Sequence, residues 1–462
     1  MKERIKTNKK FTFAIIWALL ISGISVSLAF NDSLWLDEAL SLNWTRMPWD
    51  KMMARLIVDV HPPLFYMMLR GFSFASIGSI ALGKAFVLLG YAITIFAGVL
   101  FLQKEFSASS LIFYTLFTAS IPMMLVKTVE IRMYSWAICF VVLTGIFMYK
   151  VMCDSKLLSH WIGFTLMALA SAYTHYFALL VMVFLYPLLL IFFLISKDRD
   201  AIKKWLIMCV CTIIGYLPWL PVAISQVANV NGGFWIEKQS LAGYIKELFR
   251  HDFFPHSNKI YCAIVLVLSI YLFIQYIRKK SVEYYWGIAC SIPLVAILVF
   301  GYIYGVIIGP IMIGRYLLPA LVLQIMGLSV ACRDIKWWLT GIMCLFFTAM
   351  LCMNYREAYT REYDTHTDYT KAFFEENVTS GSHLYYNNGS LPSVVVYYFP
   401  EYDTYNYDEL ETSSEMFDEF WIMDSADRVP GDMELFKDYD CIIYENMGFD
   451  NVNFTLYHLI KK

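Results

Sequence analysis

Two adjacent carboxylates, Asp37 and Glu38, follow the first apolar stretch of the chain. Placing a carboxylate beside hydrocarbon costs free energy, so acidic residues at the end of an apolar span indicate a functional site. Such a pair can remove a proton as a general base, bind a cation, or form a structural ion pair with an arginine. A nearby apolar surface raises the pKa of a carboxyl group, which makes it a better base. We therefore take these two residues as the first candidates for catalysis.

A second polar group, formed by Asp59 and His61, comes just before Pro62 and Pro63. Two consecutive prolines restrict the backbone, so they would return both side chains to the membrane surface in a fixed geometry, as a binding site requires. A histidine in a loop is more often simply solvated. The sequence leaves both interpretations open.

Glu130, Arg132 and Tyr134 lie between two later apolar stretches. A guanidinium group at a membrane surface can hold a phosphate through two parallel hydrogen bonds. The alternative is an internal ion pair between Glu130 and Arg132, and the sequence favours neither.

Three further segments carry polar or aromatic candidates. His175 and Tyr176 occupy a tight turn, where the histidine would either contact a phosphate or cap a helix. Arg315 is either an anion ligand or a snorkelling arginine. Trp235, in the aromatic stretch 232–236, would either cover a sugar or lipid chain or lie at the membrane interface, where tryptophan is common.

The elements that must position these residues are membrane spans. Hydrophobic residues make up 59% of the 462-residue chain and its mean hydropathy is +0.56, which is too apolar for an ordinary soluble domain. A helix needs about 20 apolar residues to cross a bilayer. We expect about eleven such spans, the first an uncleaved helix rather than a secretory signal. They lie near residues 11–30, 79–102, 109–126, 133–149, 158–174, 177–195, 205–224, 260–277, 285–308, 316–332 and 337–353.

Basic residues set the expected orientation. Lys and Arg are enriched in cytoplasmic loops, and here they occur at alternate breaks between the spans, beginning with the basic N-terminal segment. The N-terminus is then cytoplasmic and the C-terminal segment lies outside the cell. The loops that carry the candidate residues, including the long loops 31–78 and 225–259, all fall on the external side. Their common side favours one shared site.

Loop 31–78 contains apolar residues at helical spacing from Trp49 to Val60. This pattern predicts an amphipathic helix that lies in the outer membrane interface, although a packed connector would show the same pattern.

The last part of the chain differs sharply in charge. Residues 354–462 hold 22 of the 38 Asp and Glu residues and only 7 of the 36 Lys and Arg residues. We expect them to form a small extracytoplasmic α/β domain after a membrane module at 1–353. Its predicted elements are a helix at Thr367–Asn377 and strands at 382–386, 394–399, 417–423 and 441–444.

Several function classes find no support in the sequence. Most of the ten cysteines lie in apolar stretches and no C-x-x-C motif occurs, so neither a disulfide framework nor a zinc site is expected. No phosphate-binding glycine-rich loop is present, and we expect no nucleic-acid partner.

Carboxylates, arginines and histidines beside hydrocarbon suit one reaction in particular. A carboxylate can activate a nucleophile that attacks a carbon atom, while cations stabilise charge on a departing lipid phosphate. An ion-coupled transporter would instead place ionisable residues in mid-span and broken helices in symmetric pairs. A flippase or transporter of lipid-linked sugars and a non-catalytic membrane scaffold are the alternatives to an enzyme.

The sequence resembles the GT-C glycosyltransferases, and more narrowly the branch of protein O-mannosyltransferases and aminoarabinose transferases, glycosyltransferase family 39. The likeness covers most of residues 30–320. It rests on residues 36–39 (LDEA), 59–64 (DVHPPL), 130–134 (EIRMY), 174–176 (THY), 217–221 (LPWLP) and 315–319 (RYLLP).

The resemblance implies an inverting transfer of a sugar from a polyprenyl-phosphate donor to a lipid, glycan or protein acceptor on the outer face of a bacterial plasma membrane. Asp37 would deprotonate the acceptor hydroxyl and Glu38 would orient it. No cofactor is implied, and relatives that use lipid monophosphates generally need no metal, although a divalent cation stays open. Arg132, His175 and Arg315 would bind the donor phosphate, and the remaining substrate contacts would come from Asp59, His61, Glu130, Tyr134, Tyr176 and Trp235.

Overall fold

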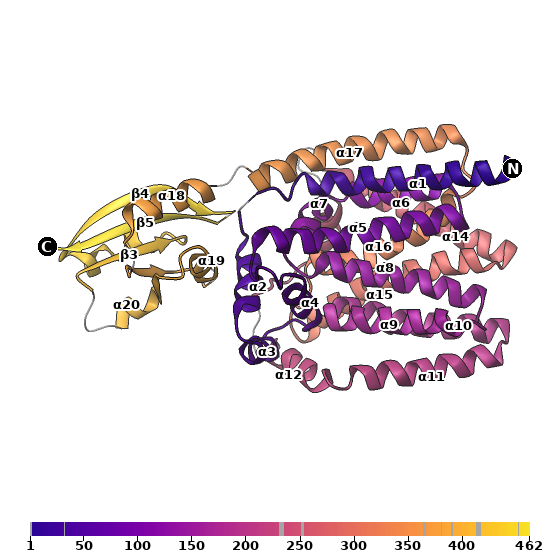
Figure 1. The fold of residues 1–462 in the computed structure, drawn as a ribbon, viewed down its shortest axis with the longest axis horizontal. Coiled ribbons are helices and arrows are strands. Elements are labelled where there is room, and N and C mark those ends of the chain that lie inside the picture. The colour runs from indigo at the N-terminus through magenta and orange to yellow at the C-terminus, as the bar shows by residue number, and fades with distance from the viewer. Residues whose placement is uncertain are drawn as a thin grey trace.

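The computed structural model describes residues 2–31, 33–230, 235–250, 254–363, 366–379, 381–389, 391–412, 417–450 and 452–462. They form a body of long helices that lie side by side and a smaller domain at one end of this body (Figure 1). The N-terminal helix begins at the opposite end (Figure 1). The helical body is a polytopic α-helical membrane module, and the smaller domain contains the sheet.

Seventeen α-helices form the body within the described residues. They are α1 (Lys2–Val26), α2 (Leu36–Arg46), α3 (Trp49–Val58), α4 (Leu64–Phe72), α5 (Ile80–Glu105), α6 (Ala108–Ala119), α7 (Pro122–Val129), α8 (Tyr134–Cys153), α9 (Leu158–Thr174), α10 (Tyr176–Ser196), α11 (Arg199–Tyr216), α12 (Leu220–Val230), α13 (Leu241–Phe249), α14 (Ser257–Lys279), α15 (Val282–Ile307), α16 (Leu318–Leu328) and α17 (Trp337–Tyr363).

Eight helices in the described part of the chain are long and apolar enough to cross a membrane, or up to ten if each of two bent pairs is one span. The sequence predicted about eleven. The difference is α9, whose 17 residues lie at the lower limit of length for a span.

Two of the predicted straight spans are bent. α6 and α7 meet at 78°, where Pro122 begins the second helix. α11 and α12 meet at 66°, near Pro218 and Pro221. A proline lacks the backbone donor that a continuous helix needs, which explains why each span breaks there.

The outer surface of the body is rich in exposed apolar side chains, as expected for contact with lipid. On α11, for example, Leu206, Ile207, Ile213 and Ile214 are each more than half exposed. α8 and α16 lie inside the body instead, and most of their side chains are buried. Van der Waals packing between helices, rather than exclusion from water, stabilises such a core in lipid.

The segment between α1 and α5 is folded into three short helices rather than an open loop. α3 forms where the apolar spacing indicates a helix, with Met52 and Leu56 fully buried. α2 and α4 were not predicted. α2 carries both Asp37 and Glu38 in its first turn, so these residues lie on a helix and not in a loop.

The C-terminal domain has a mixed five-stranded sheet in the order β2-β1-β3-β5-β4, with α18 (Thr367–Asn377), α19 (Leu391–Tyr398) and α20 (Asp408–Thr412). β1 pairs in parallel with β2 and β3, whereas β5 is antiparallel to β3 and β4. The strands are β1 (His383–Tyr386), β2 (Asp403–Asn406), β3 (Glu419–Asp424), β4 (Tyr439–Phe449) and β5 (Val452–Lys461).

The predicted strand at 394–399 is wrong, because these residues belong to α19 and its end. A short apolar run does not distinguish a buried strand from a buried helix. The other predicted strands correspond to β1, β3 and part of β4, while β2 and β5 were missed.

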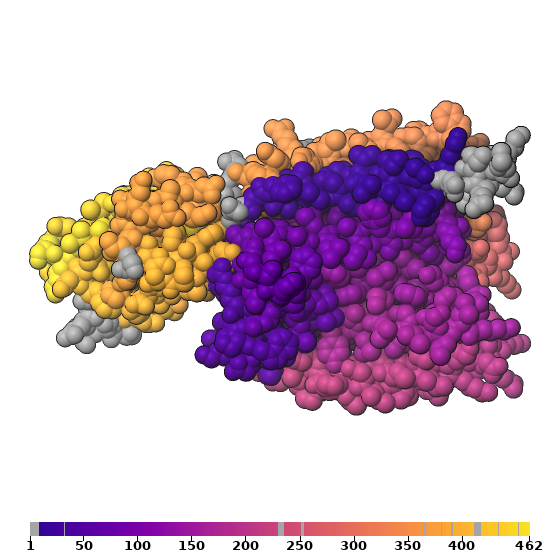
Figure 2. Space-filling model, in the orientation of Figure 1, coloured from indigo at the N-terminus to yellow at the C-terminus, as the bar shows by residue number. Residues whose placement is uncertain are grey.

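α19 attaches the C-terminal domain to α2. The side-chain amide of Asn43 donates a hydrogen bond of 2.7 Å to the carbonyl oxygen of Ser393. One turn further along α2, the guanidinium of Arg46 lies 4.0 Å from the centre of the Tyr397 ring. The helix that carries Asp37 therefore also contacts the C-terminal domain, which forms a separate lobe beside it (Figure 2).

Candidate active site

Asp37 lies in the first turn of α2, between two arginines from distant parts of the chain. Its Oδ2 atom is 3.9 Å from Nε of Arg132 and 4.0 Å from Nη2 of Arg315. About a third of its side chain is exposed. Burial alone would raise the pKa of Asp37, but Arg132 and Arg315 outweigh this effect and hold the pKa below its ordinary value. Asp37 is therefore an accessible, ionised carboxylate.

Arg132 follows α7 and is almost completely buried. Its Nη1 atom donates hydrogen bonds to Ser41 Oγ at 3.2 Å and to the Tyr66 hydroxyl at 3.1 Å. Nη2 lies 3.3 Å from Nε2 of His61. These contacts fix the plane of the guanidinium, but its buried Nε–H group has no hydrogen-bond acceptor among the described residues. An unused buried donor is costly, so this group is suited to an anionic ligand.

Arg315 approaches Asp37 from the short helix η1 (Gly314–Leu317), just before α16. Its buried Nε–H group likewise has no acceptor in the part of the chain that the structure describes. The guanidinium carbon lies 5.8 Å from the centre of the Trp235 ring and 6.0 Å from that of Tyr316. Two arginine donors thus flank the same carboxylate.

His61 and Asp59 form a closely coupled pair. Nδ1 of His61 lies 2.7 Å from Oδ2 of Asp59. Because an arginine can only donate, Nε2 of His61 must accept from Arg132, so Nδ1 carries the proton given to Asp59. Burial would raise the pKa of Asp59, but its hydrogen bond with His61 keeps the pKa below the ordinary value. The histidine is not merely solvated but links Asp59 to Arg132.

Glu38 is adjacent to Asp37 but has a different environment. Only 3% of the residue is exposed. Oε1 accepts hydrogen bonds from Lys84 Nζ at 3.0 Å and from the Ile131 N–H at 2.7 Å, and Oε2 accepts from the Trp35 N–H at 2.9 Å. Burial raises the pKa of Glu38, while Lys84 opposes this rise. Glu38 thereby holds the segment before Arg132 against the start of α2.

Glu130 forms an ion pair with Lys127 on α7, and its Oε1 atom has no hydrogen-bond partner among the described residues. The internal pair with Arg132 that the sequence left open does not form, because Arg132 faces Asp37 instead. Glu130 lies close enough to Glu38 to contribute to the raised pKa of that carboxyl group.

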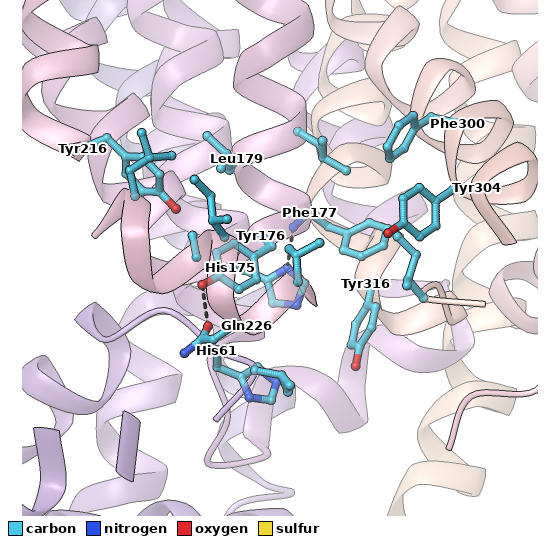
Figure 3. Close-up of a pocket in the computed structure, with 17 residues that line it drawn as sticks. His61, His175, Tyr176, Phe177, Leu179, Tyr216, Gln226, Phe300, Tyr304 and Tyr316 are labelled. Atoms are coloured by element: carbon cyan, nitrogen blue, oxygen red, sulfur yellow. Dashed lines mark hydrogen bonds between the residues drawn. The ribbon is translucent and has the colours of Figure 1, made fainter. Parts of the chain in front are cut away.

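An apolar cavity of about 410 Å³ adjoins this polar cluster. Figure 3 shows His61 and Tyr316 at one end of it, with Tyr216, Leu179 and Phe300 toward the other. The helices around it are α10, α11, α12 and α15. A ligand with a polar head and a long apolar chain fits such a cavity.

Both His175 and Tyr176 line the cavity. Nδ1 of His175 accepts a hydrogen bond of 3.1 Å from the Phe177 N–H, so the side chain of His175 caps α10. In the neutral ring, the proton is therefore on Nε2. Burial lowers the pKa of His175 to about 3, which keeps the ring neutral. The Tyr176 hydroxyl donates to Gln226 Oε1 at 2.5 Å, and the Gln226 amide donates to the Leu56 carbonyl oxygen.

The structure brings the predicted residues to one end of the body. Asp37, Arg132 and Arg315 meet directly, and Trp235 lies beside Arg315. Tyr134 is buried at the start of α8, with its ring 5.9 Å from that of His175. Residues 232–234 of the predicted aromatic stretch lie outside the described residues.

Sequence reasoning missed five residues of the cluster: Ser41, Tyr66, Lys84, Lys127 and Gln226. Lys84 and Lys127 had a detectable signal, since each is a lone cation in or beside an apolar stretch. The other three are ordinary polar residues whose positions depend on helix packing. Within the described residues, no group of three or more His, Cys, Asp or Glu side chains is arranged to hold a metal ion.

The fold is similar to that of ArnT from Cupriavidus metallidurans, solved bound to undecaprenyl phosphate and in the apo state. The bound structure superimposes with a TM-score of 0.67 and 11% identity over 97% of each chain. The apo structure gives the same TM-score and identity over 98% of each chain. The apo oligosaccharyltransferase from Archaeoglobus fulgidus matches with a TM-score of 0.50 and 8% identity, over 84% of this chain and 64% of that one.

These structural matches show that the chain shares the fold of ArnT, which is the GT-C fold that the sequence predicted. No protein-family model matches the sequence, and a search of curated proteins finds no match.

Proposed function

We propose that this protein is an inverting glycosyltransferase that moves a sugar from a polyprenyl-phosphate donor to a hydroxyl group of an acceptor. One observation carries the proposal: an accessible carboxylate, Asp37, is flanked by two arginines with unused donors beside an apolar cavity. The fold of ArnT, which binds undecaprenyl phosphate, supports a donor of this class.

The cavity would hold the first isoprene units of the donor. Its volume of about 410 Å³ lies within the range of roughly 300–1,000 Å³ typical of ligand pockets. At its polar end, the Nε–H groups of Arg132 and Arg315 and the Nε2–H group of His175 would donate to the phosphate. Trp235 and Tyr134 lie next to these groups and would contact the sugar.

In the reaction, Asp37 accepts the proton of the acceptor hydroxyl. The acceptor oxygen forms a bond with the anomeric carbon as the bond from that carbon to the phosphate oxygen breaks. The phosphate oxygen keeps the electron pair of the broken bond, so polyprenyl phosphate leaves as an anion stabilised by Arg132 and Arg315. Attack opposite to the leaving group inverts the anomeric centre.

Donor binding would also activate the base. In the structure, Arg132 and Arg315 keep the pKa of Asp37 low against the effect of burial. A bound phosphate would partly neutralise both guanidinium groups, so the pKa of Asp37 would rise toward the range of an effective base. Proton transfer is then favoured only when the donor is in place.

Glu38 has a positioning role in this scheme. Its two oxygens are already engaged by Lys84, Ile131 and Trp35. It therefore aligns α2 with the segment that carries Arg132, while Asp37 makes contact with the substrate. The site would face the outside of a bacterial plasma membrane, with the N-terminus cytoplasmic, and its acceptor would be a lipid, glycan or protein.

A flippase for lipid-linked sugars is the second candidate. The two bent helix pairs, α6 with α7 and α11 with α12, favour it, since broken helices occur in transporters. The two functions make different products. A flippase moves intact donor lipid across the bilayer, whereas the proposed enzyme releases polyprenyl phosphate.

The test is reconstitution of the purified protein with radiolabelled polyprenyl-phosphate sugar and an extract of the native membrane as the source of acceptor. We expect release of polyprenyl phosphate and transfer of label to an acceptor. Asp37→Asn should lower transfer by at least 10³-fold while undecaprenyl phosphate still binds. Full transfer activity in this variant would remove Asp37 as the base, and movement of intact donor without release would favour the flippase.

Binding of undecaprenyl phosphate tests the phosphate site separately. Arg315→Ala should weaken binding about tenfold or more, because a charge-assisted hydrogen bond is worth about 1.5–3 kcal/mol. Arg333→Ala is the matched control, since this arginine pairs with Glu283 and is separated from Arg315 by the whole length of α16. Equal affinities in both variants and the wild type would contradict the assignment of Arg315 to the phosphate.

A further inference from the structure

A second cleft, of about 440 Å³, lies between the catalytic helices and the C-terminal domain. α2 contributes Asn43 and Trp44 to its walls, α3 and its end contribute Arg55 and Asp59, and α19 contributes Ser393 and Val396. The proposed donor site does not use this cleft.

The cleft lies on the face of α2 that also carries Asp37. Leu40 and Trp44 line it, at three and seven residues after Asp37, and Met47 lines it just beyond the end of the helix. Residues at this spacing follow one stripe along a helix, and each turn advances about 5.4 Å. The wall of the cleft therefore continues along α2 to the carboxylate of Asp37.

The cleft and the apolar cavity meet at one pair of residues. Asp59 lines the cleft, whereas His61 lines the cavity, and the two side chains are hydrogen-bonded at 2.7 Å. A molecule in the cleft and a lipid chain in the cavity would approach the site from opposite sides of this pair. An in-line displacement needs this arrangement of nucleophile and leaving group.

The cleft offers a positive charge to its ligand. Arg55 is exposed and lines the cleft, and no carboxylate among the described residues forms an ion pair with it. Asp59, the acid within the cleft, is already engaged by His61. Arg55 is thus suited to an anionic group such as a phosphate or carboxylate.

The position of α3 indicates how a ligand reaches the cleft. Three apolar side chains of this helix are strongly exposed: Trp49 at 49%, Ile57 at 46% and Val58 at 68%. Val58 also lines the cleft. A helix with exposed aromatic and aliphatic residues at the end of a membrane body lies in the lipid interface. The cleft then opens at the depth of the lipid headgroups.

We infer that this cleft is the acceptor site and that it binds the anionic headgroup of a membrane-borne, hydroxyl-bearing lipid. Arg55 holds the anionic group, α19 of the C-terminal domain forms the opposite wall, and the acceptor hydroxyl reaches Asp37 along α2. This inference rests on the proposed transferase function. It gives the C-terminal domain a part in the choice of acceptor.

Binding of dihexanoyl-phosphatidylglycerol to the full-length protein tests the inference. This probe carries hydroxyl groups and a phosphate and is soluble enough for calorimetry in detergent. Arg55→Ala should weaken its binding about tenfold, and Val396→Trp should do so by filling the cleft from the domain side. Lys51→Ala, on the same helix but outside the cleft, and Ile442→Trp, on exposed β4, should keep the affinity of the wild type within twofold.

Two competitors identify the source of the anion. Dihexanoyl-phosphatidylcholine should fail to displace the probe. Inorganic phosphate should displace it only at much higher concentration, because it lacks the rest of the headgroup. Equal affinity in the wild type and the Arg55→Ala variant overturns the inference, and so does displacement by phosphate as effective as displacement by the unlabelled probe.

Undecaprenyl phosphate binding in the same preparations separates this inference from the proposed function. Arg55→Ala should leave that binding unchanged. If the wild type binds undecaprenyl phosphate and transfers sugar while phosphatidylglycerol binding is independent of Arg55, the acceptor cleft is wrong and the transferase stands. If the wild type transfers no sugar and binds no undecaprenyl phosphate, the proposed function fails.

Discussion

Nζ of Lys84 lies 3.0 Å from Oε1 of Glu38, and both side chains are at most 4% exposed. The pair joins a membrane helix, α5, to the first turn of α2. Glu362, at the end of α17, lies 3.8 Å from the same ammonium group. Glu38 also accepts a hydrogen bond from the Ile131 N–H. The buried ammonium group of Lys84 therefore stabilises the positions of α2, the end of α17 and the segment at Ile131 around the site.

Lys84→Met should therefore destabilise the protein. Removing one partner of a buried ion pair leaves an uncompensated charge and costs about 3–5 kcal/mol. Thermal unfolding in detergent measures this loss, with Lys104→Met, whose side chain is 79% exposed, as the control. Adding Glu38→Gln to the variant should restore part of the stability. A Lys84→Met protein as stable as the control would contradict a structural role for the pair.

The pH dependence of kcat/KM should report the arginines around Asp37. Burial would raise the pKa of Asp37, but Arg132 and Arg315 lower it below the ordinary value. Asp37 therefore stays ionised down to a lower pH than an ordinary aspartate, and we expect activity to be lost only when the pH falls through that lowered pKa. Arg132→Gln removes one of these charges, so the acid limb of the profile should move to higher pH.

The titration of His175 does not contribute to this pH profile. Its pKa lies at about 3 because it is buried, so the ring stays neutral through the pH range of the assay. A profile for Arg132→Gln with an unshifted acid limb would show that Asp37 is not the group that titrates.

Filling the apolar cavity should impair binding of long lipids selectively. Val227 lines the cavity on α12, and Val227→Trp would fill the space that the proposed function assigns to the isoprenoid chain. We expect a loss of about tenfold in affinity for undecaprenyl phosphate and a smaller loss for geranyl phosphate. Ile213→Trp, on a lipid-exposed position of α11, is the matched control. Equal losses of affinity for both lipids would show that the isoprenoid chain binds outside this cavity.

The sequence was sufficient to predict that the polar residues of the site gather at one end of the body, because consecutive membrane helices run in alternate directions. Each span returns the chain to the opposite side, so loops separated by an even number of spans must share one end of the body. Asp37, Arg132 and Arg315 come from such loops when the 17-residue helix α9 is counted as a span, and Asp37 lies within about 4 Å of both arginines. The sequence also predicted the bounds of α18, Thr367–Asn377, as the structure has them.

Other features depend on packing that no local pattern encodes. α2 mixes apolar and polar residues, since it contacts both the body and the C-terminal domain, so its sequence lacks a clean apolar stripe. Residues 394–399 form a short apolar run whose buried side packs into the domain. Such a run occurs equally in buried strands and in buried helices. The different environments of Asp37 and Glu38 follow from their directions on one helical turn, about 100° apart.

The apolar cavity next to His61 would contact the portion of the carrier that the proposed reaction leaves unaltered. Loaded and spent carriers would thus occupy it with comparable strength, and the spent form adds a newly uncovered phosphate for the arginines. Product would then compete directly with fresh donor. Turnover in the cell would be governed by how quickly other proteins withdraw and recharge the discarded carrier.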